Sequence, residues 1–564
     1  VNIANASILQ SDLNENNIPD NEETNVIVTT NKTLLAGEYD FNNLIITNYA
    51  VLTLEGDPNS QNNFKGVKIN ATNITIDLGA SISADGKGYA PATGPGAPTS
   101  QYMGASYGGV GGGGSTISLY GSATKPLDLG SGGNGNGNFS RGGGAIQLVL
   151  INSLTNNGTI STNSSATGSG GSIYIKTNIL NGMGEFTSTG GRADCPNVCF
   201  GPGGGGRIAI YYQNSSFTGT ALAKGWNQFG GASEDGTVGF FDITKNNLQV
   251  FNSPWQFRNT DAPFNFNKMI FQGAKITADN NIQITANNLL IDQNSSFTLS
   301  NNQNLSIPII TINNNSTLTL SGEEIINTNS ISVKEYSTIT VLPLKILSLT
   351  IPNITIDYSS SISANNKGHP PATGPGAPTS QYMGASHGGI GSGNVPTSTY
   401  GSEITPTDFG SGGNGNSNFS YGGGAIRLIV NNTLVNDGVI SADSSATGSG
   451  GSVYITVNNL SGTGTFSARG GRADCPNICF GPGGGGRIAI YYQNSSFIGD
   501  TTVAGWNQFG GTSTAGTIIM EASSPVCTEN CFSNVLFLPG LEASRLYNMS
   551  SGSENQLWEP NRNL

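Results

Sequence analysis

The chain has 564 residues, of which 81 are glycine and only 10% are charged. Its 23 Lys and Arg residues against 35 Asp and Glu residues give a formal net charge of −12. This balance argues against nucleic-acid binding, which needs clustered Lys and Arg to neutralise phosphates, and against docking on an anionic membrane. No apolar run is long enough to form a transmembrane helix.

The acidic segment 12–23 is the first stretch with a recognisable pattern. Oxygen-bearing side chains occupy its positions 1, 3, 5, 9 and 12, the spacing with which a loop wraps one Ca²⁺, and position 7 would offer its carbonyl. Position 6 is Asn17, which tolerates the left-handed conformation needed there. The segment resembles the calcium loops of thrombospondin type 3 and dockerin-like modules, and the alternative is a polar, solvated linker. The predicted metal ligands are Asp12, Asn14, Asn16, Ile18, Asp20 and Glu23.

From Asn25 onward, short apolar runs with period-two alternation are separated by Asn and Gly, as in 282–285, 309–312 and 317–320. No apolar stripe at helical spacing runs for three turns. Strands this short favour a right-handed parallel β-helix, whose corners can be built from Asn in the left-handed conformation, stacked in ladders. The alternatives are a β-sandwich and a β-propeller. The sequence therefore predicts an all-β solenoid.

Two long segments, 73–230 and 353–510, are copies of each other. The difference Cys475 − Cys195 is 280, and the same offset relates Trp506 to Trp226. A duplication this long without insertions indicates a tightly specified backbone path. The Gly-rich stretches 86–144 and 367–424 keep this register, so we expect them to form defined loops along one face of the solenoid.

Several Gly-rich segments end in short apolar strands. They resemble the glycine-rich β-helical segments of very large bacterial surface proteins, and the resemblance covers most of residues 25–522. It implies an extracellular, adhesin-like or stalk-like role and brings no defined catalysis. The segments that carry the resemblance are 79–88, 142–146, 168–175 and 203–212.

Six cysteines form three pairs with one common spacing. Uniform local pairing favours three disulfides. A zinc site is the alternative, but no pair has a His or a second Cys pair nearby, and zinc prefers four ligands. Disulfides imply an oxidising, extracellular compartment. The predicted bridges are Cys195–Cys199, Cys475–Cys479 and Cys527–Cys531.

Residues 523–564 differ from the rest of the chain. An apolar run, 534–538, leads into Pro-Gly-Leu at 539–541 and Ser-Arg-Leu at 544–546. This order is similar to the opening of α/β-hydrolases of the lecithin–cholesterol acyltransferase-like kind, in which the loop after the strand helps form the oxyanion hole. The resemblance implies that the region of Leu541 takes that place and that a lipase- or esterase-like domain follows downstream.

Two G-x-S-x-G matches place Ser106 and Ser386 between glycines, as in the nucleophile elbow of a hydrolase. That elbow needs a strand before the serine and a helix after it, whereas Gly-rich sequence surrounds both serines. The only histidines are His369 and His387, and the first copy has Tyr at both positions. A Ser–His pair therefore cannot form in both copies, and we predict no catalytic site here.

Parallel β-helices also host polysaccharide lyases and hydrolases, which cluster Asp on adjacent coils. Asp77 and Asp85 come nearest, but Asp85 becomes Asn365 in the second copy, and a turn is the simpler explanation. Tyr211-Tyr212 and Trp226 could stack on sugar rings, although alternation points one Tyr of the pair inward.

Arg192, Asp194 and Arg207 recur in the second copy. We interpret them as an Arg–Asp pair that braces the disulfide loop, with a ligand-binding loop as the alternative.

These patterns predict an extracellular, β-helical spacer or adhesin-like segment of a larger protein, non-catalytic by itself. The alternatives are a carbohydrate-binding or carbohydrate-active β-helix, and the non-catalytic part of a secreted lipase- or esterase-like protein. Whether the chain is an enzyme stays open. The expected cofactor is Ca²⁺, and the expected partner is a carbohydrate or another cell-surface ligand. The predicted parts are an acidic linker (1–24), a first β-helix block (25–245), connecting coils (246–350), a second block (351–522) and a linker with the start of a hydrolase-like domain (523–564).

Overall fold

The computed structural model divides into two compact units, Val1–Ala522 and Ser523–Leu564. The structure describes residues 11–60, 64–114, 119–135, 139–192, 200–228, 231–393, 398–415, 420–472, 480–508, 511–522, 546–550 and 553–558. These residues form strands, turns and the short 3₁₀ helices η1 (Asp20–Glu22) and η3 (Asn259–Asp261), and none of them lies in an α-helix. The predicted all-β class is therefore confirmed. No helix of the described residues has the length and apolarity needed to cross a membrane.

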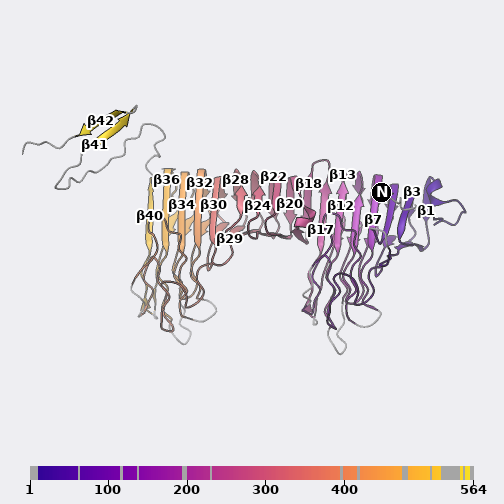
Figure 1. Ribbon diagram of the computed structural model, residues 1–564, viewed down its shortest axis with the longest axis horizontal. Coiled ribbons are helices and arrows are strands. Elements are labelled where there is room, and N and C mark those ends of the chain that lie inside the picture. The colour runs from indigo at the N-terminus through magenta and orange to yellow at the C-terminus, as the bar shows by residue number, and fades with distance from the viewer. Residues whose placement is uncertain are drawn as a thin grey trace, which may run out of the picture. The chain divides into compact units, whose positions relative to one another are not determined.

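One long sheet runs through the whole first unit, and Figure 1 shows its strands in a row from β1 to β40. Its 21 strands are β1 (Asn25–Val28), β3 (Gly37–Ile46), β5 (Val67–Ile76), β7 (Ala145–Asn156), β9 (Ser172–Lys176), β10 (Ile179–Asn181), β12 (Arg207–Tyr212), β13 (Asn214–Ser215), β17 (Thr237–Asp242), β18 (Asn247–Phe251), β20 (Phe264–Gln272), β22 (Gln283–Asp292), β24 (Asn304–Ser306), β25 (Ile309–Ile312), β27 (Ile325–Asn327), β28 (Ser330–Val333), β30 (Ile346–Ile356), β32 (Ala425–Asn436), β34 (Ser452–Ser461), β36 (Arg487–Ser495) and β40 (Thr517–Ala522).

Two short parallel sheets alternate with the long sheet along the chain. The first short sheet contains β2 (Lys32–Leu34), β4 (Val51–Leu54), β6 (Ser81–Ser83), β8 (Thr159–Ser161), β11 (Glu185–Thr187) and β14 (Thr220–Leu222). The second contains β19 (Pro254–Phe257), β21 (Lys275–Ala278), β23 (Ser296–Thr298), β26 (Thr317–Leu320), β29 (Thr338–Val341), β31 (Ser361–Ser363), β33 (Val439–Ser441), β35 (Thr465–Ser467) and β37 (Asp500–Thr502). The remaining strands form antiparallel pairs: β15 (Asn227–Gln228) with β16 (Gly231–Ala232), β38 (Asn507–Gln508) with β39 (Gly511–Thr512), and, in the second unit, β41 (Leu546–Ser550) with β42 (Ser553–Trp558).

The period-two alternation decides which face of each strand is buried. In β26, Leu318 and Leu320 are fully buried while the two Thr side chains are half-buried. The pairing is parallel and in register, so Leu318 lies beside Ile339 of β29. Each buried Leu or Ile contributes about 1.5–3 kcal/mol relative to an exposed one, and rows of them hold the paired strands together.

Asparagine builds the corners between the sheets, as the sequence predicts. Asn294, Asn314 and Asn315 have positive φ values of 62°, 49° and 58°. The Asn315 side-chain amide donates to Asn294 Oδ1 at 2.7 Å in the preceding turn. This contact between asparagines satisfies polar groups where the backbone turns.

The long sheet reverses chain direction between β17 and β18. These two strands are antiparallel, with Phe241 opposite Leu248, whereas the other adjacent strands described in this sheet are parallel. The buried core changes face at the same place. Val238 and Phe240 of β17 belong to a first core, which extends from Leu13 and lies against the first short sheet. Phe241 and Leu248 belong to a second core on the opposite face, against the second short sheet.

This junction is therefore covered on both faces, and all six residues of β17 are buried. On its second-core face, the Tyr211 ring stacks on Phe241 with centroids 4.2 Å apart, and Trp255 of β19 meets Phe241 edge-on at 5.9 Å. The sequence run Val-Gly-Phe-Phe at 238–241 lacks polar alternation because neither face meets water.

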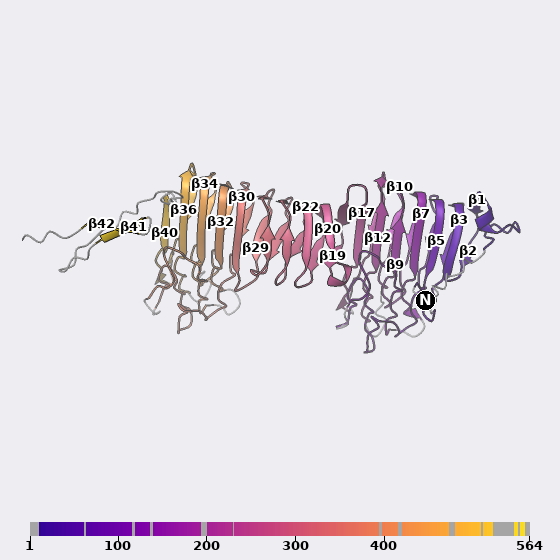
Figure 2. The same ribbon diagram turned by 45° about the horizontal axis from the view of Figure 1, so that its top comes forward.

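The Gly-rich segments project from the strands in both copies (Figure 1 and Figure 2) and are held together by backbone hydrogen bonds. The Gly170 N–H donates to Gly204 O at 3.0 Å, and the equivalent Gly450 N–H donates to Gly484 O at 2.9 Å. A Cβ on Gly204 would lie 2.0 Å from a backbone oxygen, so only glycine allows this approach. The loops thus keep the 280-residue register in three dimensions.

Candidate functional site

The acidic loop at the N-terminal end closes over the first core. The Asp12 carboxylate accepts hydrogen bonds from the backbone N–H groups of Asn16 at 3.1 Å and Asn17 at 2.9 Å. Asn17 has a φ of 67°, the left-handed conformation predicted for this position. Leu13 is buried in the first core. The loop is therefore anchored to the coils and is not a freely solvated linker.

The amides predicted to bind calcium face the last carboxylate of the loop. Asn14 Nδ2 donates to Glu23 Oε2 at 2.9 Å, and Asn16 Nδ2 donates to Glu23 Oε1 at 2.5 Å. Asn14 Oδ1 is buried and has no hydrogen-bond partner among the residues that the structure describes. Because an amide presents an oxygen in place of its nitrogen when it turns, both side chains can offer oxygen toward the same point.

Asp20 is the buried carboxylate of the loop, and it accepts a hydrogen bond from the Leu13 N–H at 3.0 Å. Burial raises the pKa of Asp20, and the nearby Glu23 and Asp12 carboxylates add to this effect. A divalent cation would relieve their mutual repulsion. Among the described residues, no group of three or more His, Cys, Asp and Glu is arranged to hold a metal. Calcium would therefore need the Asn amide oxygens and the Ile18 carbonyl as further ligands. The loop contains these groups, so its residues fit a calcium ion.

The six cysteines and Asp194 lie outside the described residues, so the three disulfides and the Arg192–Asp194 pair stay predictions. Close to them, Arg192 lies over the Trp226 ring at 5.9 Å. The second copy repeats this contact, with Arg472 at 5.8 Å from the Trp506 ring. Trp226 is 37% exposed. Its ring is thus partly covered by a cation–π contact within the chain.

The two G-x-S-x-G serines are fully buried inside the Gly-rich loops. Ser106 Oγ accepts a hydrogen bond from the Gly111 N–H at 3.0 Å, and Ser386 Oγ accepts one from the Gly391 N–H at 2.9 Å. In the described residues around them, no strand leads into either serine and no helix leaves it. The hydroxyls therefore brace the loops and are not presented as nucleophiles.

Asp85 serves as a cap for a neighbouring turn. Its Oδ1 accepts a hydrogen bond from the Asn163 N–H at 2.6 Å. In the second copy Asn365 Oδ1 accepts one from the Asp443 N–H at 2.7 Å. An amide oxygen replaces the carboxylate without loss of the contact, which agrees with the turn interpretation.

The tyrosine pair of β12 is used for packing. Tyr212 is 7% exposed and belongs to the first core. Tyr211 points the other way, stacks on Phe241, and donates its hydroxyl to Thr124 O at 2.7 Å. The predicted alternation is present, and both rings take part in packing contacts on opposite faces of β12.

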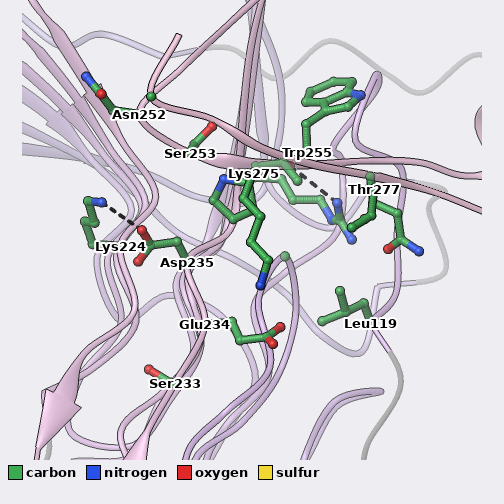
Figure 3. A pocket seen from close by; sticks show the side chains of 16 residues that line it. Leu119, Lys224, Ser233, Glu234, Asp235, Asn252, Ser253, Trp255, Lys275 and Thr277 are labelled. Atoms are coloured by element: carbon green, nitrogen blue, oxygen red, sulfur yellow. Dashed lines mark hydrogen bonds and ion pairs between the residues drawn. The ribbon is translucent and has the colours of Figure 1, made fainter. Parts of the chain in front are cut away.

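A cleft of about 570 Å³ lies beside the junction, between the loop 233–235 and the strands β17, β19 and β21 (Figure 3). Lys224 and Asp235 form an ion pair across its wall at 2.7 Å. The Lys275 side chain extends toward Glu234 in Figure 3, and neither forms an ion pair within the part of the chain that the structure describes. We call this space the junction cleft.

Arg207 of β12 forms the inner wall of the junction cleft and is 1% exposed. Its Nε donates to Tyr120 O at 3.1 Å, and its Nη1 lies 3.4 Å from Thr237 Oγ1. Burial lowers the pKa of Arg207. No carboxylate within the described ranges forms an ion pair with this guanidinium.

Sequence reasoning missed the junction cleft, although the two copies differ in charge there. The second copy keeps Arg207 as Arg487 but has uncharged residues at three other positions that supply charges of the cleft. Lys224, Glu234 and Asp235 correspond to Ala504, Thr514 and Ala515.

Comparison of the chain with known protein families, with curated proteins and with solved structures finds no match. What the junction cleft can do follows from its own side chains. They supply charge-assisted and neutral hydrogen bonds in a concave space whose volume is typical of small-molecule sites. The lining that the structure describes therefore supports binding of a polar ligand.

Proposed function

We propose that the first unit is a right-handed parallel β-helix that serves as an extracellular spacer or adhesin-like display segment of a larger protein. The continuous pairing of the long sheet from β1 to β40 carries this proposal, because every coil is hydrogen-bonded to the next. Parallel strands joined by a crossover are right-handed in nearly all known proteins. At the junction, strand direction and core face invert together, so the coils on both sides wind with the same hand.

A solenoid suits display because its coils contact only their neighbours and the stack can be extended without a larger core. The Gly-rich loops project from this stack in both copies. Their backbone hydrogen bonds hold them in a defined conformation without apolar side chains. A stack of this kind that carries defined loops supports the proposed cell-surface role.

Immunolabelling of intact cells that produce the protein tests this function. Antibodies raised against residues 1–564 should label the unbroken cells, and an external protease should remove the label. An antibody against an intracellular protein of the same cells is the control, since it should label only permeabilised cells. Label that appears only after permeabilisation would overturn the display function.

We further propose that the loop 12–23 binds one Ca²⁺ with an affinity of about 10⁻⁴–10⁻³ M, the range of extracellular modules. The left-handed Asn17, the unpaired Asn14 oxygen and the crowded carboxylates support this site. Calorimetry of Ca²⁺ binding to the full chain and to Glu23→Gln tests it. Glu521→Ala, which removes an exposed carboxylate at the other end of the first unit, is the matched control. Equal heats for Glu23→Gln and the wild type would exclude the loop.

The second candidate function is carbohydrate binding, and the junction cleft favours it. Polar side chains that exchange hydrogen bonds with hydroxyl groups line the cleft, which is the usual composition of a sugar site. The hydroxyl and amide side chains among them are Ser233, Thr237, Asn252, Ser253, Gln256 and Thr277.

A further inference from the structure

The junction cleft has more positive than negative charge. Its cations are Arg207, Lys224 and Lys275, and its carboxylates are Glu234 and Asp235. Lys224 and Asp235 neutralise each other at 2.7 Å. The remaining carboxylate, Glu234, is exposed to water, whereas Arg207 is 1% exposed. The inner wall of the cleft is thus cationic, and water screens it poorly.

The second copy indicates what an arginine at this place takes as its partner. There, Arg487 Nη1 forms an ion pair with Glu403 at 2.9 Å and also donates to Thr517 Oγ1 at 3.0 Å. The first copy has Ala123 in place of Glu403, and it lacks this ion pair. The hydrogen bonds of the Arg207 guanidinium to Tyr120 O, Thr237 Oγ1 and Tyr107 O all go to uncharged oxygens, so an anionic ligand can take the place that Glu403 has in the second copy.

Trp255 of β19 also lines the cleft, but its ring belongs to the second core and meets Phe241 edge-on at 5.9 Å. The polar groups that the cleft offers to a ligand therefore come from its other side chains. Gln256 donates its amide to Asp279 Oδ1 at 2.9 Å, which fixes the side chain beside the cleft.

From these features we propose that the junction cleft binds a carboxylated saccharide, whose carboxylate is held by Arg207 and Lys275. The hydroxyl groups of the sugar meet the Ser, Thr, Asn and Gln side chains that line the cleft. The cleft of about 570 Å³ accommodates a short oligosaccharide. This inference rests on the carbohydrate-binding candidate function and is independent of the display function.

Calorimetry on the full chain with three probes tests the proposal. The probes are trigalacturonate, sialyllactose and the neutral trisaccharide maltotriose. We expect one acidic probe to bind with a stoichiometry of one, at least about tenfold more tightly than maltotriose, and more weakly as salt is added. The acidic probe that binds distinguishes a hexuronate from a sialic acid as the source of the carboxylate.

Two substitutions with opposite expected effects assign the binding to this cleft. Lys275→Glu should weaken the acidic probe at least about tenfold, because an exposed cation in the cleft becomes an anion. Glu234→Gln should tighten it a few-fold, because it removes a repelling carboxylate. Lys334→Glu makes the same charge change on an exposed lysine of the connecting coils and should leave affinity unchanged.

The outcomes separate the inference from the function on which it rests. Equal binding of acidic and neutral probes, or an affinity insensitive to Lys275→Glu, would overturn the carboxylate inference while carbohydrate binding stands. Absence of binding by all three probes would remove the carbohydrate-binding function itself. Weaker binding by Glu234→Gln would also contradict the proposal, because Glu234 would then act as a ligand contact.

Discussion

The two copies have the same backbone path in different surroundings. After the first copy, β17 is buried along its whole length because the chain turns back and places β18 and Trp255 against it. At the equivalent position, β40 lies at the end of the described sheet, and its side chains are half-buried or exposed. Phe241 of β17 accordingly corresponds to Glu521 of β40.

This difference shows that the repeated residues determine the backbone path of each copy. A few outward-facing residues differ between the copies according to the element that lies next to them. The same dependence on the neighbouring element holds for Ala123, which lies beside the junction, and for its counterpart Glu403, which lies far from the junction. The first is buried among apolar side chains, and the second is 58% exposed and paired with Arg487. The following substitutions test that separation between shared coil and adapted contact.

The largest effect is expected at the aromatic contact of the junction. Phe241→Ala should lower the free energy of unfolding by about 3–5 kcal/mol, because it leaves a cavity between Tyr211 and Trp255. Glu521→Ala, at the equivalent position, should change it by less than about 0.5 kcal/mol. Urea unfolding followed by tryptophan fluorescence measures both. Similar losses for the two variants would show that the junction does not bury Phe241.

The second copy should lose folding stability at acidic pH because of its buried histidine. His387 is fully buried, its Nδ1 lies 2.8 Å from Gly450 O, and its Nε2 has no partner in the described part of the chain. Burial lowers the pKa of His387 to about 4 from its ordinary value of 6.5. Because the unfolded chain takes up the proton first, stability is complete above pH 6.5 and falls as the pH drops toward 4. The expected loss is on the order of 3 kcal/mol.

The first copy provides the control for this prediction. Tyr107 stands at the equivalent position, and its hydroxyl lies 2.6 Å from Ser172 Oγ. Because the second copy has Ser452 at the matching place, His387→Tyr should fit and remove this acid-dependent loss. Unfolding midpoints at pH 7 and pH 4.5 compare the two proteins. An unchanged pH dependence in the variant would assign the effect to another group.

Calcium should act at one end of the first unit only. If the loop 12–23 binds it, Ca²⁺ at ten times the dissociation constant stabilises that end by about 1.4 kcal/mol. Hydrogen exchange should then slow in β1 and β3, which lie next to the loop, and stay the same in β36 and β40. Slowing at both ends would indicate a general effect of the ion.

The smallest effect is expected for the ion pair that is present only in the second copy. Glu403→Ala should cost at most about 1 kcal/mol, because the carboxylate is 58% exposed and water screens the pair. The loss should shrink as salt is added. A loss of several kcal/mol would mean that Arg487 depends on Glu403 for its burial.

The all-β class and the buried face of most strands could be predicted from the sequence because their determinants are local. Alternation in segments such as 317–320 determines which side chains face the core, and Asn314 and Asn315 mark a corner by their tolerance of positive φ. The direction change at β17 could not be predicted, because alternation reads the same on either face of a sheet. The unbroken apolar run 238–241 was its one local sign.

The junction cleft could not be predicted from the sequence for a different reason. Lys224 and Glu234 lie on neighbouring segments of the first copy, and only the reversal brings Lys275 of β21 beside them. The acidic loop was easier, since its oxygens follow one another along the chain and the left-handed Asn17 occupies the expected position.

The hairpin between β17 and β18 also determines how the strand directions at the two ends of the long sheet are related. Each such hairpin inverts the direction in which later strands run, so with one reversal β1 and β40 run in opposite directions in the same sheet. Addition of another 280-residue period with its own hairpin would restore the original direction. In an array of such periods, the strands at the two terminal edges would run in the same direction when the number of hairpins is even and in opposite directions when it is odd. The order in which each edge offers its N–H and C=O groups would follow from that direction.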